Sequence, residues 1–491
     1  MTARRAPLRA PAVTARRAPL RAPAAKAGRA PLRAPAATAR RAPMLALAAL
    51  LAHAGCADSG DDLALAIRLP ADTTRLGAVS QLNLSARRGD VVLAQASFAA
   101  GTTRLALAGV SFGASTVVRL DGVDAAGAVI ATGRTCPIDF QTSGMSAPLY
   151  LAPTNFFAPT AGAPLVQRTR PVAAALSDGT VAILGGADST TVELMTPGAA
   201  SFTALPSSLG QARRQAEAVT LTGAGVLVVG GVSASGDAIA GGELLLESQR
   251  TLVPVTDPRL DARVGHRVVE LSEGRAFVSG GAASTSGAPL STTVLVRVFS
   301  DGTYQLSDGV PLAEARREHA VVVAAGTAML FGGRGAGDLV LDSVEAFDPT
   351  TGATSAAAPI AHLATARAGA TASVLPDNSG ILLTGGQGSD GKPLASAEVF
   401  NLVTRTTTTF TMAAARRGHT ATVLDDGRVL IAGGFDAAGN PLRSVEIFTS
   451  GVGFVSEIDL GSARGDHAAL SLCDGTVLLV GGAATAELYT P

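Results

Sequence analysis

The chain has 491 residues, and its 39 Lys and Arg residues balance its 39 Asp and Glu residues. Three cysteines are too few for a disulfide framework, and the length is sufficient for more than one domain. Eleven basic residues and no acidic residue lie in residues 1–43, so the remainder has 28 basic against 39 acidic residues, a net charge of −11. This acidic remainder excludes nucleic acid and anionic membrane surfaces as direct partners of the folded part.

Residues 1–43 are a degenerate repeat of a short unit rich in Ala, Arg and Pro. Such a composition cannot bury a hydrophobic core, so we expect this segment to be disordered. We interpret it as an extended basic region in front of a signal peptide, or as the product of a misassigned start codon. A nucleic-acid-binding arm is the minor alternative.

Residues 44–56 form an apolar segment that ends at Cys56. The segment is too short to span a bilayer but suits the apolar region of a signal peptide. Ala54-Gly55-Cys56 resembles the cleavage site of bacterial lipoproteins, although His53 departs from the usual leucine. The resemblance implies an exported protein that is held at the bacterial membrane or cell surface by a lipid on Cys56. A plain secretory signal or a chance apolar run is the alternative.

Residues 57–150 begin with a polar tether and continue as short alternating strands separated by turn residues. The predicted strands are 63–69, 81–86, 91–98, 103–107, 115–120 and 129–133. This spacing is typical of a β-sandwich of immunoglobulin-like or fibronectin-like type. Such a module would serve as a spacer or a binding platform.

A glycine pair recurs seven times in the remaining residues, at intervals of about 50 residues that are typical of a repeat architecture. The pairs are Gly185 and Gly186, Gly230 and Gly231, Gly280 and Gly281, Gly332 and Gly333, Gly385 and Gly386, Gly433 and Gly434, and Gly481 and Gly482. Each pair ends a short apolar run that reads as a buried strand, and a turn containing glycine precedes that run.

Charged residues stand at fixed places around each pair. An arginine opens every repeat, in the column Arg168, Arg213, Arg263, Arg316, Arg367, Arg416 and Arg464. A histidine follows three residues later in four repeats, as His266, His319, His419 and His467. A glutamate opens the third strand in six repeats, as Glu193, Glu243, Glu345, Glu398, Glu446 and Glu487. In the third repeat we place Arg297 at the glutamate position.

A fourth strand completes each repeat, so each is predicted to be a four-stranded antiparallel blade with strands A to D. The pattern of R-x-x-H, a turn, an apolar run, Gly-Gly and S-x-E-x-F resembles the Kelch repeat over residues 156–491. The resemblance implies an all-β, seven-bladed propeller in residues 151–491, behind the sandwich of residues 57–150. The chain departs from many Kelch repeats in having no tryptophan. The last repeat lacks a fourth strand, and we expect the strand near Phe156 to complete its blade.

Cys136 and Cys473 remain after Cys56. The sandwich leads directly into the last blade, and Cys473 lies by the A–B turn of that blade, so the two thiols could form a disulfide between the domains. Two unpaired thiols are the alternative.

The repeated polar columns have two interpretations. The arginines and glutamates could form repeated salt bridges, because buried charges require partners. Alternatively, the resemblance implies that the seven arginines lie on the face of the D–A connections and B–C loops, through which Kelch-type propellers commonly bind partners. Each histidine is expected to make a hydrogen bond at the start of its own strand. Blade symmetry separates the histidines too widely for a metal site, so we expect no metal or other cofactor.

No Ser-His-Asp set, CxxC pair or phosphate-binding loop is evident. Arg464-Gly465-Asp466 spells an adhesion tripeptide, which we interpret as a coincidence within the arginine column. We expect a monomeric, non-catalytic binding or scaffold protein that uses one propeller face to bind a protein or a glycan. The alternative is a carbohydrate-active enzyme of Kelch-propeller type, either a sugar isomerase or a galactose-oxidase-like protein.

Overall fold

A computed structural model of the chain describes residues 51–55, 62–102, 105, 107, 113, 115–139, 145–272, 274–348, 358–376, 380–456 and 458–491. These residues fall in a single compact unit, Leu47–Pro491. The predicted basic segment 1–43 and the predicted lipidation site Cys56 lie outside the described residues. Within them, no helix is long and apolar enough to cross a membrane.

The first domain consists of two β-sheets that share one core. The larger sheet has the order β4 (Val91–Ala99), β3 (Gln81–Arg88), β5 (Val117–Val123), β6 (Val129–Arg134) and β8 (Ala152–Pro153). The smaller sheet has the order β1 (Leu51–Gly55), β2 (Asp62–Arg68) and β7 (Met145–Tyr150), and its β2–β7 pair is parallel. A short 3-10 helix, η1 (Thr74–Ala78), lies between β2 and β3.

Alternation along the strands produces this sandwich. Leu82, Leu84 and Ala86 of β3 are buried, and they pack in the same cluster as Leu65 of β2 and Leu149 of β7. A period of two places every second side chain on one face, so both sheets direct an apolar face inward. The sandwich extends beyond the predicted boundary at residue 150, because β8 pairs with β6. It also includes β1, which falls within the predicted signal segment.

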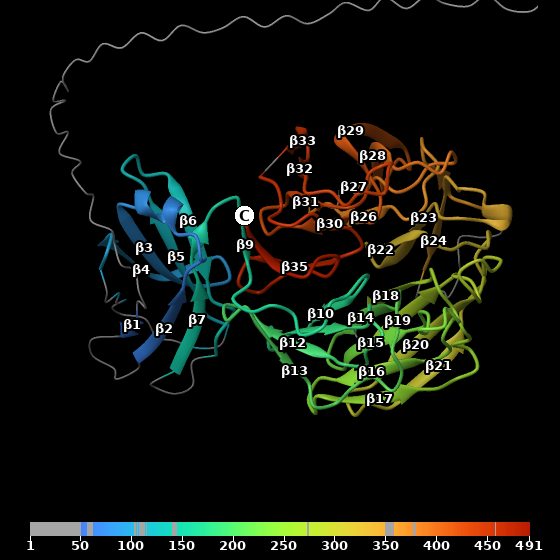
Figure 1. Ribbon diagram of the computed structural model, residues 1–491, viewed down its shortest axis with the longest axis horizontal. Coiled ribbons are helices and arrows are strands. Elements are labelled where there is room, and N and C mark those ends of the chain that lie inside the picture. Colours follow the sequence, from blue (N-terminus) through green and yellow to red (C-terminus); the bar gives the residue numbers. More distant parts are fainter. Residues whose placement is uncertain are drawn as a thin grey trace, which may run out of the picture. The chain divides into compact units, whose positions relative to one another are not determined.

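The second domain contains seven four-stranded antiparallel sheets, which follow one another around a ring (Figure 1). The A strands are β10 (Val172–Ala175), β14 (Glu217–Leu221), β18 (Arg267–Ser272), β22 (Ala320–Ala324), β26 (Thr371–Val374), β30 (Thr420–Val423) and β34 (Ala468–Ser471). The B strands are β11 (Val181–Leu184), β15 (Gly225–Val229), β19 (Arg275–Ser279), β23 (Thr327–Phe331), β27 (Gly380–Thr384), β31 (Val429–Ala432) and β35 (Val477–Val480).

The outer two strands of each blade follow the same order. The C strands are β12 (Glu193–Thr196), β16 (Gly242–Leu246), β20 (Thr293–Val298), β24 (Ser343–Phe347), β28 (Leu394–Asn401), β32 (Val445–Thr449) and β36 (Glu487–Thr490). The D strands are β13 (Ser201–Ala204), β17 (Thr251–Val255), β21 (Tyr304–Asp308), β25 (Ala361–His362), β29 (Thr407–Arg416), β33 (Gly453–Ser456) and β9 (Phe156–Pro159). A 3-10 helix, η2 (Ala336–Asp338), lies in the B–C loop of the fourth blade.

The ring is closed by a strand that precedes the first blade in the chain. Strand β9 pairs antiparallel with β36 and supplies the D strand of the seventh blade, as expected from the sequence. The rings of Phe157 and Tyr489 lie 4.7 Å apart between their centroids. The A strands of neighbouring blades contact one another around the axis, including β10 with β34. Closure leaves the propeller no open seam between its first and last blades.

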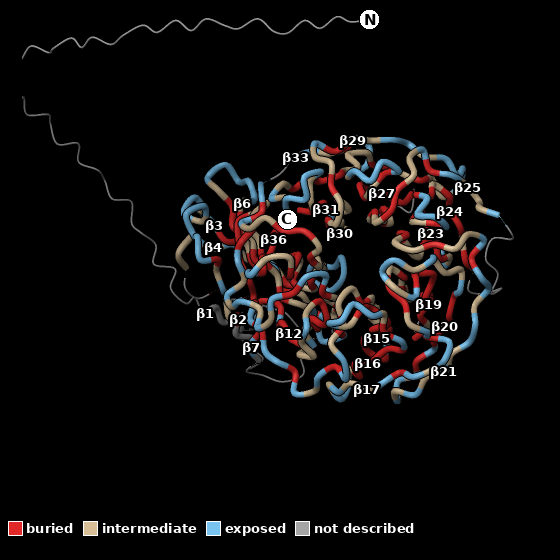
Figure 2. The backbone as a smooth tube through the Cα atoms, turned by 45° about the vertical axis from the view of Figure 1, so that its right-hand side comes forward, coloured by how far each residue is buried: buried red, intermediate tan, exposed pale blue. Residues whose placement is uncertain are grey.

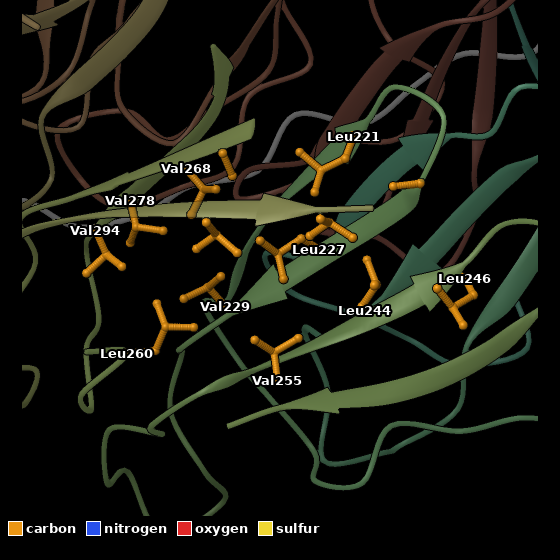
Figure 3. Close-up of a cluster of buried hydrophobic side chains, with 14 residues drawn as sticks. Leu221, Leu227, Val229, Leu244, Leu246, Val255, Leu260, Val268, Val278 and Val294 are labelled. Carbon is orange, nitrogen blue, oxygen red and sulfur yellow. The ribbon is translucent and has the colours of Figure 1, made fainter. Parts of the chain in front are cut away.

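Apolar side chains fill the space between neighbouring blades. Figure 2 shows that the buried residues follow the strands, whereas exposed residues gather in the connections. In the cluster between the second and third blades, Leu227 and Leu244 pack with Val268, Val278 and Leu260 (Figure 3). A separate apolar cluster thus lies between each pair of neighbouring blades, and no tryptophan is needed to fill it.

A disulfide between Cys136 and Cys473 joins the two domains, with 4.8 Å between the Cα atoms. Cys136 follows β6 of the sandwich, and Cys473 lies in the A–B turn of the seventh blade. Beside it, Arg134 Nε donates a hydrogen bond of 3.2 Å to the Cys473 carbonyl, and Arg134 Nη2 lies 2.5 Å from Asp425 Oδ2. The sandwich is thus attached on the A–B turn side of the propeller, which leaves the opposite face clear of it.

Candidate functional site

The seven column arginines are buried, with 0–4% of each residue exposed. In six blades the guanidinium group forms an ion pair with the glutamate of the same blade, at 2.5–3.1 Å between nitrogen and oxygen. This corrects the expectation that these arginines line a binding face. The residues so corrected are Arg168, Arg213, Arg263, Arg316, Arg367, Arg416 and Arg464. They are structural residues, because a buried charge remains stable only when it is paired and hydrogen-bonded.

Each arginine also joins its blade to the preceding blade through the glycine pair. Its Nη1 donates to the carbonyl of the first glycine of its own blade, at 2.6–3.4 Å. Its own carbonyl accepts a hydrogen bond of 2.8–3.0 Å from the second glycine of the preceding blade. The last of these bonds, from Gly482 to Arg168, closes the ring. The glycine pair therefore forms part of every joint between blades.

The joint explains why glycine is required. Both glycines of every pair have positive φ values, which glycine adopts without steric cost. In six pairs, a Cβ on the first glycine would lie 2.3–2.8 Å from the carbonyl oxygen of the next arginine. No side chain can be added there unless the two blades separate.

Besides pairing with the arginines, the glutamates accept hydrogen bonds from the backbone of the D–A connections. Glu398, for example, accepts hydrogen bonds from the backbone N–H groups of Ala364 and Thr365, at 2.7 and 3.0 Å. Burial lowers the pKa of Arg367, and the hydrogen bond and charge of Glu398 oppose that shift. Burial likewise lowers the pKa of Arg416, and the charge and hydrogen bond of Glu446 oppose that shift. These carboxylates are saturated by internal partners, so they are not available for a ligand.

The third blade departs from the pattern. Val278 pairs with Val294, which makes Val294 the structural equivalent of the glutamates, and the assignment of Arg297 to this position was wrong. Arg297 is exposed and lies over the ring of Phe299. Arg263 instead pairs with Asp261 in its own D–A connection.

Three of the four column histidines hydrogen-bond a side chain of the preceding blade. His319 Nε2 lies 2.9 Å from Ser279 Oγ, and His419 Nε2 lies 2.8 Å from Thr384 Oγ1, in each case on the preceding blade. The expected hydrogen bond within the histidine's own blade is therefore wrong for these residues. Burial lowers the pKa of His419 and His467 to about 3, so both are neutral at physiological pH. His266 has no such hydroxyl, because Val229 occupies the position of Ser279 and Thr384.

A cavity of about 560 Å³ opens at the axis, and residues from all seven blades line it. Its lining includes every residue that lies two positions after a column arginine, which we call the inner ring. The inner ring consists of Arg170, Gln215, Gly265, Glu318, Gly369, Gly418 and Asp466. Its members are exposed or half-buried, unlike the column arginines. The inner ring was not predicted from the sequence, although glycine at this position in three repeats marks a backbone constraint.

The side chains around the cavity are largely paired with one another. Arg170 Nε lies 2.9 Å from Asp466 Oδ2, and Arg170 Nη1 donates to Gln215 Oε1 at 3.2 Å. On the fourth blade, Arg334 Nε donates to Glu318 Oε2 at 3.0 Å. Arg417 lies 5.2 Å from the ring centroid of Phe435. The site presents many hydrogen-bond donors and acceptors but little net charge.

The comparison with protein families agrees with this geometry. Residues 416–450 match the Kelch motif model, and they span the A, B and C strands of the sixth blade. The same arginine and glycine pair recur in the other six blades, and the glutamate recurs in five of them. The chain is a Kelch-repeat β-propeller.

The comparisons with individual proteins add little to this assignment. The solved structure of YjhT is similar, with 17% sequence identity and a TM-score of 0.47 over 60% of this chain and 99% of that chain. No curated protein matches the chain. The function of this Kelch propeller must therefore be argued from its own axial cavity. Across the described ranges, no three His, Cys, Asp or Glu side chains gather as a metal site would require.

Proposed function

We propose that this Kelch propeller is a non-catalytic binding protein that holds a protein or a glycan on the face of its D–A connections and B–C loops. The observation that carries this proposal is the axial cavity, which is lined by polar side chains from all seven blades. The sandwich is attached on the A–B turn side by the Cys136–Cys473 disulfide. A partner could therefore approach the cavity without meeting the first domain.

The chemistry of the cavity favours binding over catalysis. His419 and His467 line it, but with a pKa of about 3 neither would take up a proton at neutral pH. The carboxylates of Glu318 and Asp466 are held by arginines. The alternative, an enzyme acting on sugars, would need one of these carboxylates to be released from its arginine when substrate binds.

We further propose that the protein is exported and attached to the membrane through Cys56. The disulfide between Cys136 and Cys473 supports export, because such bonds persist in oxidising compartments. Metabolic labelling with a palmitate probe tests the anchor. Label on the wild type and none on Cys56→Ser supports it, and an unlabelled wild type refutes it.

A face-specific comparison tests the binding function. The purified protein is applied to a glycan array and, separately, cross-linked to a bacterial surface extract. Arg214→Glu and Arg417→Glu change the proposed face, whereas Arg405→Glu changes a C–D turn on the opposite face. We expect the first two variants to lose the partner and the third to keep it. The opposite pattern would place binding elsewhere, and turnover of a bound glycan, detected by mass spectrometry, would favour the enzyme.

A further inference from the structure

All seven inner-ring residues adopt the left-handed backbone conformation. Their φ values lie between 52° and 68°, although only three of them are glycine. The other four are Arg170, Gln215, Glu318 and Asp466. In the left-handed region a residue with a Cβ is strained, and Arg, Gln and Glu have no compensating preference for it.

Backbone hydrogen bonds around the axis impose this conformation. The N–H of Arg170 donates to the carbonyl of Asp466 at 2.6 Å, and the N–H of Asp466 donates to the carbonyl of Gly418 at 2.8 Å. Two further bonds of 2.7 Å run from Gly369 to Glu318 and from Glu318 to Gly265. The inner ring thus needs left-handed backbone whatever the side chain, and glycine is the least costly residue for it.

The four polar side chains therefore reduce stability at their positions. Their mutual contacts do not repay that cost, because the Arg170–Asp466 pair is partly exposed and such pairs contribute little. All four line the axial cavity. Strained residues gathered at a cavity point to a function that the strain supports.

The chemistry of the lining indicates which ligand fits. Four guanidinium groups, of Arg170, Arg267, Arg317 and Arg417, face three carboxylates, of Glu217, Glu318 and Asp466. Each carboxylate already has an arginine partner. A paired carboxylate and guanidinium offer an acceptor beside a donor, and a hydroxyl group uses both because it donates and accepts. The volume of about 560 Å³ falls within the range of small-molecule sites.

Resting on the binding function proposed above, we propose that Arg170, Gln215, Glu318 and Asp466 recognise an uncharged, hydroxyl-rich ligand, the end of a neutral saccharide, in the axial cavity. Arg170, with its partners Asp466 and Gln215, lies on one side of the inner ring. Glu318 with Arg334 lies across the cavity from it. Hydroxyl groups of the ligand bridge these two clusters.

Glycine substitution separates recognition from folding. The double variant Arg170→Gly with Asp466→Gly removes both partners of an ion pair at once, so that no unpaired charge remains. The matched control is Arg250→Gly, because Arg250 also has a positive φ, of 53°, and pairs with an aspartate, Asp178. Arg250 lies in a C–D turn, on the opposite face. Both proteins are examined as full chains for melting temperature and for binding to an array of neutral saccharides and their uronic acid or sialylated counterparts.

We expect the wild type to bind neutral members of the array. The double variant should bind them at least tenfold more weakly, with a melting temperature equal to or above that of the wild type. Arg250→Gly should leave binding unchanged. A melting temperature several degrees lower in the double variant would show that the pair is structural and would overturn the proposal.

Other outcomes separate the proposal from the function on which it rests. Unchanged saccharide binding in the double variant refutes recognition by the inner ring but leaves the binding face intact. Binding of acidic saccharides alone, or capture of a protein partner with no saccharide bound, refutes the ligand class only. If neither a saccharide nor a protein binds this face, the proposed function itself is wrong.

Discussion

The buried histidines predict that the propeller loses stability as the pH falls. Burial lowers the pKa of His266, His419 and His467 to about 3, and it holds the pKa of His319 well below its usual value. An unfolded histidine titrates near pH 6.5, so below that pH the unfolded chain binds protons that the folded chain does not. The stabilisation is therefore present above about pH 6.5 and is lost as the pH falls towards 3.

The size of the effect follows from linkage. Between pH 7 and pH 5, one histidine with a folded pKa near 3 loses about 2 kcal/mol of stabilisation, since a tenfold change in protonation equals about 1.4 kcal/mol. The value requires only that the folded pKa stays well below 5. The three histidines with a pKa of about 3 together give about 6 kcal/mol, which is comparable to the whole stability of a typical domain of about 5–15 kcal/mol.

Urea denaturation at pH 7, 6 and 5 measures this loss, and one variant assigns it. His266→Leu replaces a titrating side chain with an apolar one of similar size. His266 has no hydroxyl partner on the preceding blade, so this change breaks no side-chain hydrogen bond there. We expect its loss of unfolding free energy between pH 7 and pH 5 to be about 2 kcal/mol smaller than that of the wild type. The control is His362→Leu, because His362 has 64% of its side chain exposed and lies 2.9 Å from Asp342. An unchanged pH dependence in a folded His266→Leu protein would show that the buried His266 does not cause the loss of stability.

Three further predictions concern the joints of the molecule. Glu398→Ala leaves a buried arginine unpaired and should lower the unfolding free energy by about 3–5 kcal/mol in urea titrations at pH 7; a loss below 1 kcal/mol would contradict the buried pair. Gly280→Ala places a Cβ 2.3 Å from a carbonyl oxygen and should destabilise far more than Gly326→Ala, where nothing lies within 4 Å; equal melting temperatures would contradict the joint between blades. Replacing Cys136 and Cys473 by serine should speed proteolytic separation of the two domains without unfolding the propeller. Gel electrophoresis follows the cleavage, and circular dichroism follows the fold. Unchanged cleavage would show that the disulfide is not needed to hold the domains together.

Much of the fold could be predicted from the sequence because the same sequence pattern recurs in each repeat. Gly-Gly after an apolar run, followed by a glutamate, predicts strands B and C, and the missing fourth strand of the last repeat predicts the role of Phe157. The glutamate position of the third repeat was predicted wrongly because the B–C loop there is one residue longer than in the second, fourth, fifth and sixth repeats. Val294, the second residue of that C strand, occupies the glutamate position, and Arg297 lies three residues further along.

The site was less predictable. An arginine in a sequence gives no sign of whether it is buried, and the column arginines gain burial only because the glutamate of each blade and the glycine carbonyl meet them. The inner ring was hidden because Arg170, Gln215, Glu318 and Asp466 share no chemistry. What they share is a backbone conformation, which the sequence reveals only where glycine takes it.

Hydrogen exchange of the full chain, with and without a bound neutral saccharide, directly tests ligand binding at the inner ring. We expect protection on binding to be confined to peptides that contain the inner ring, above all residues 168–170, 317–319 and 464–467. Protection confined to the A–B turns or to the sandwich, with the inner ring unchanged, would contradict it.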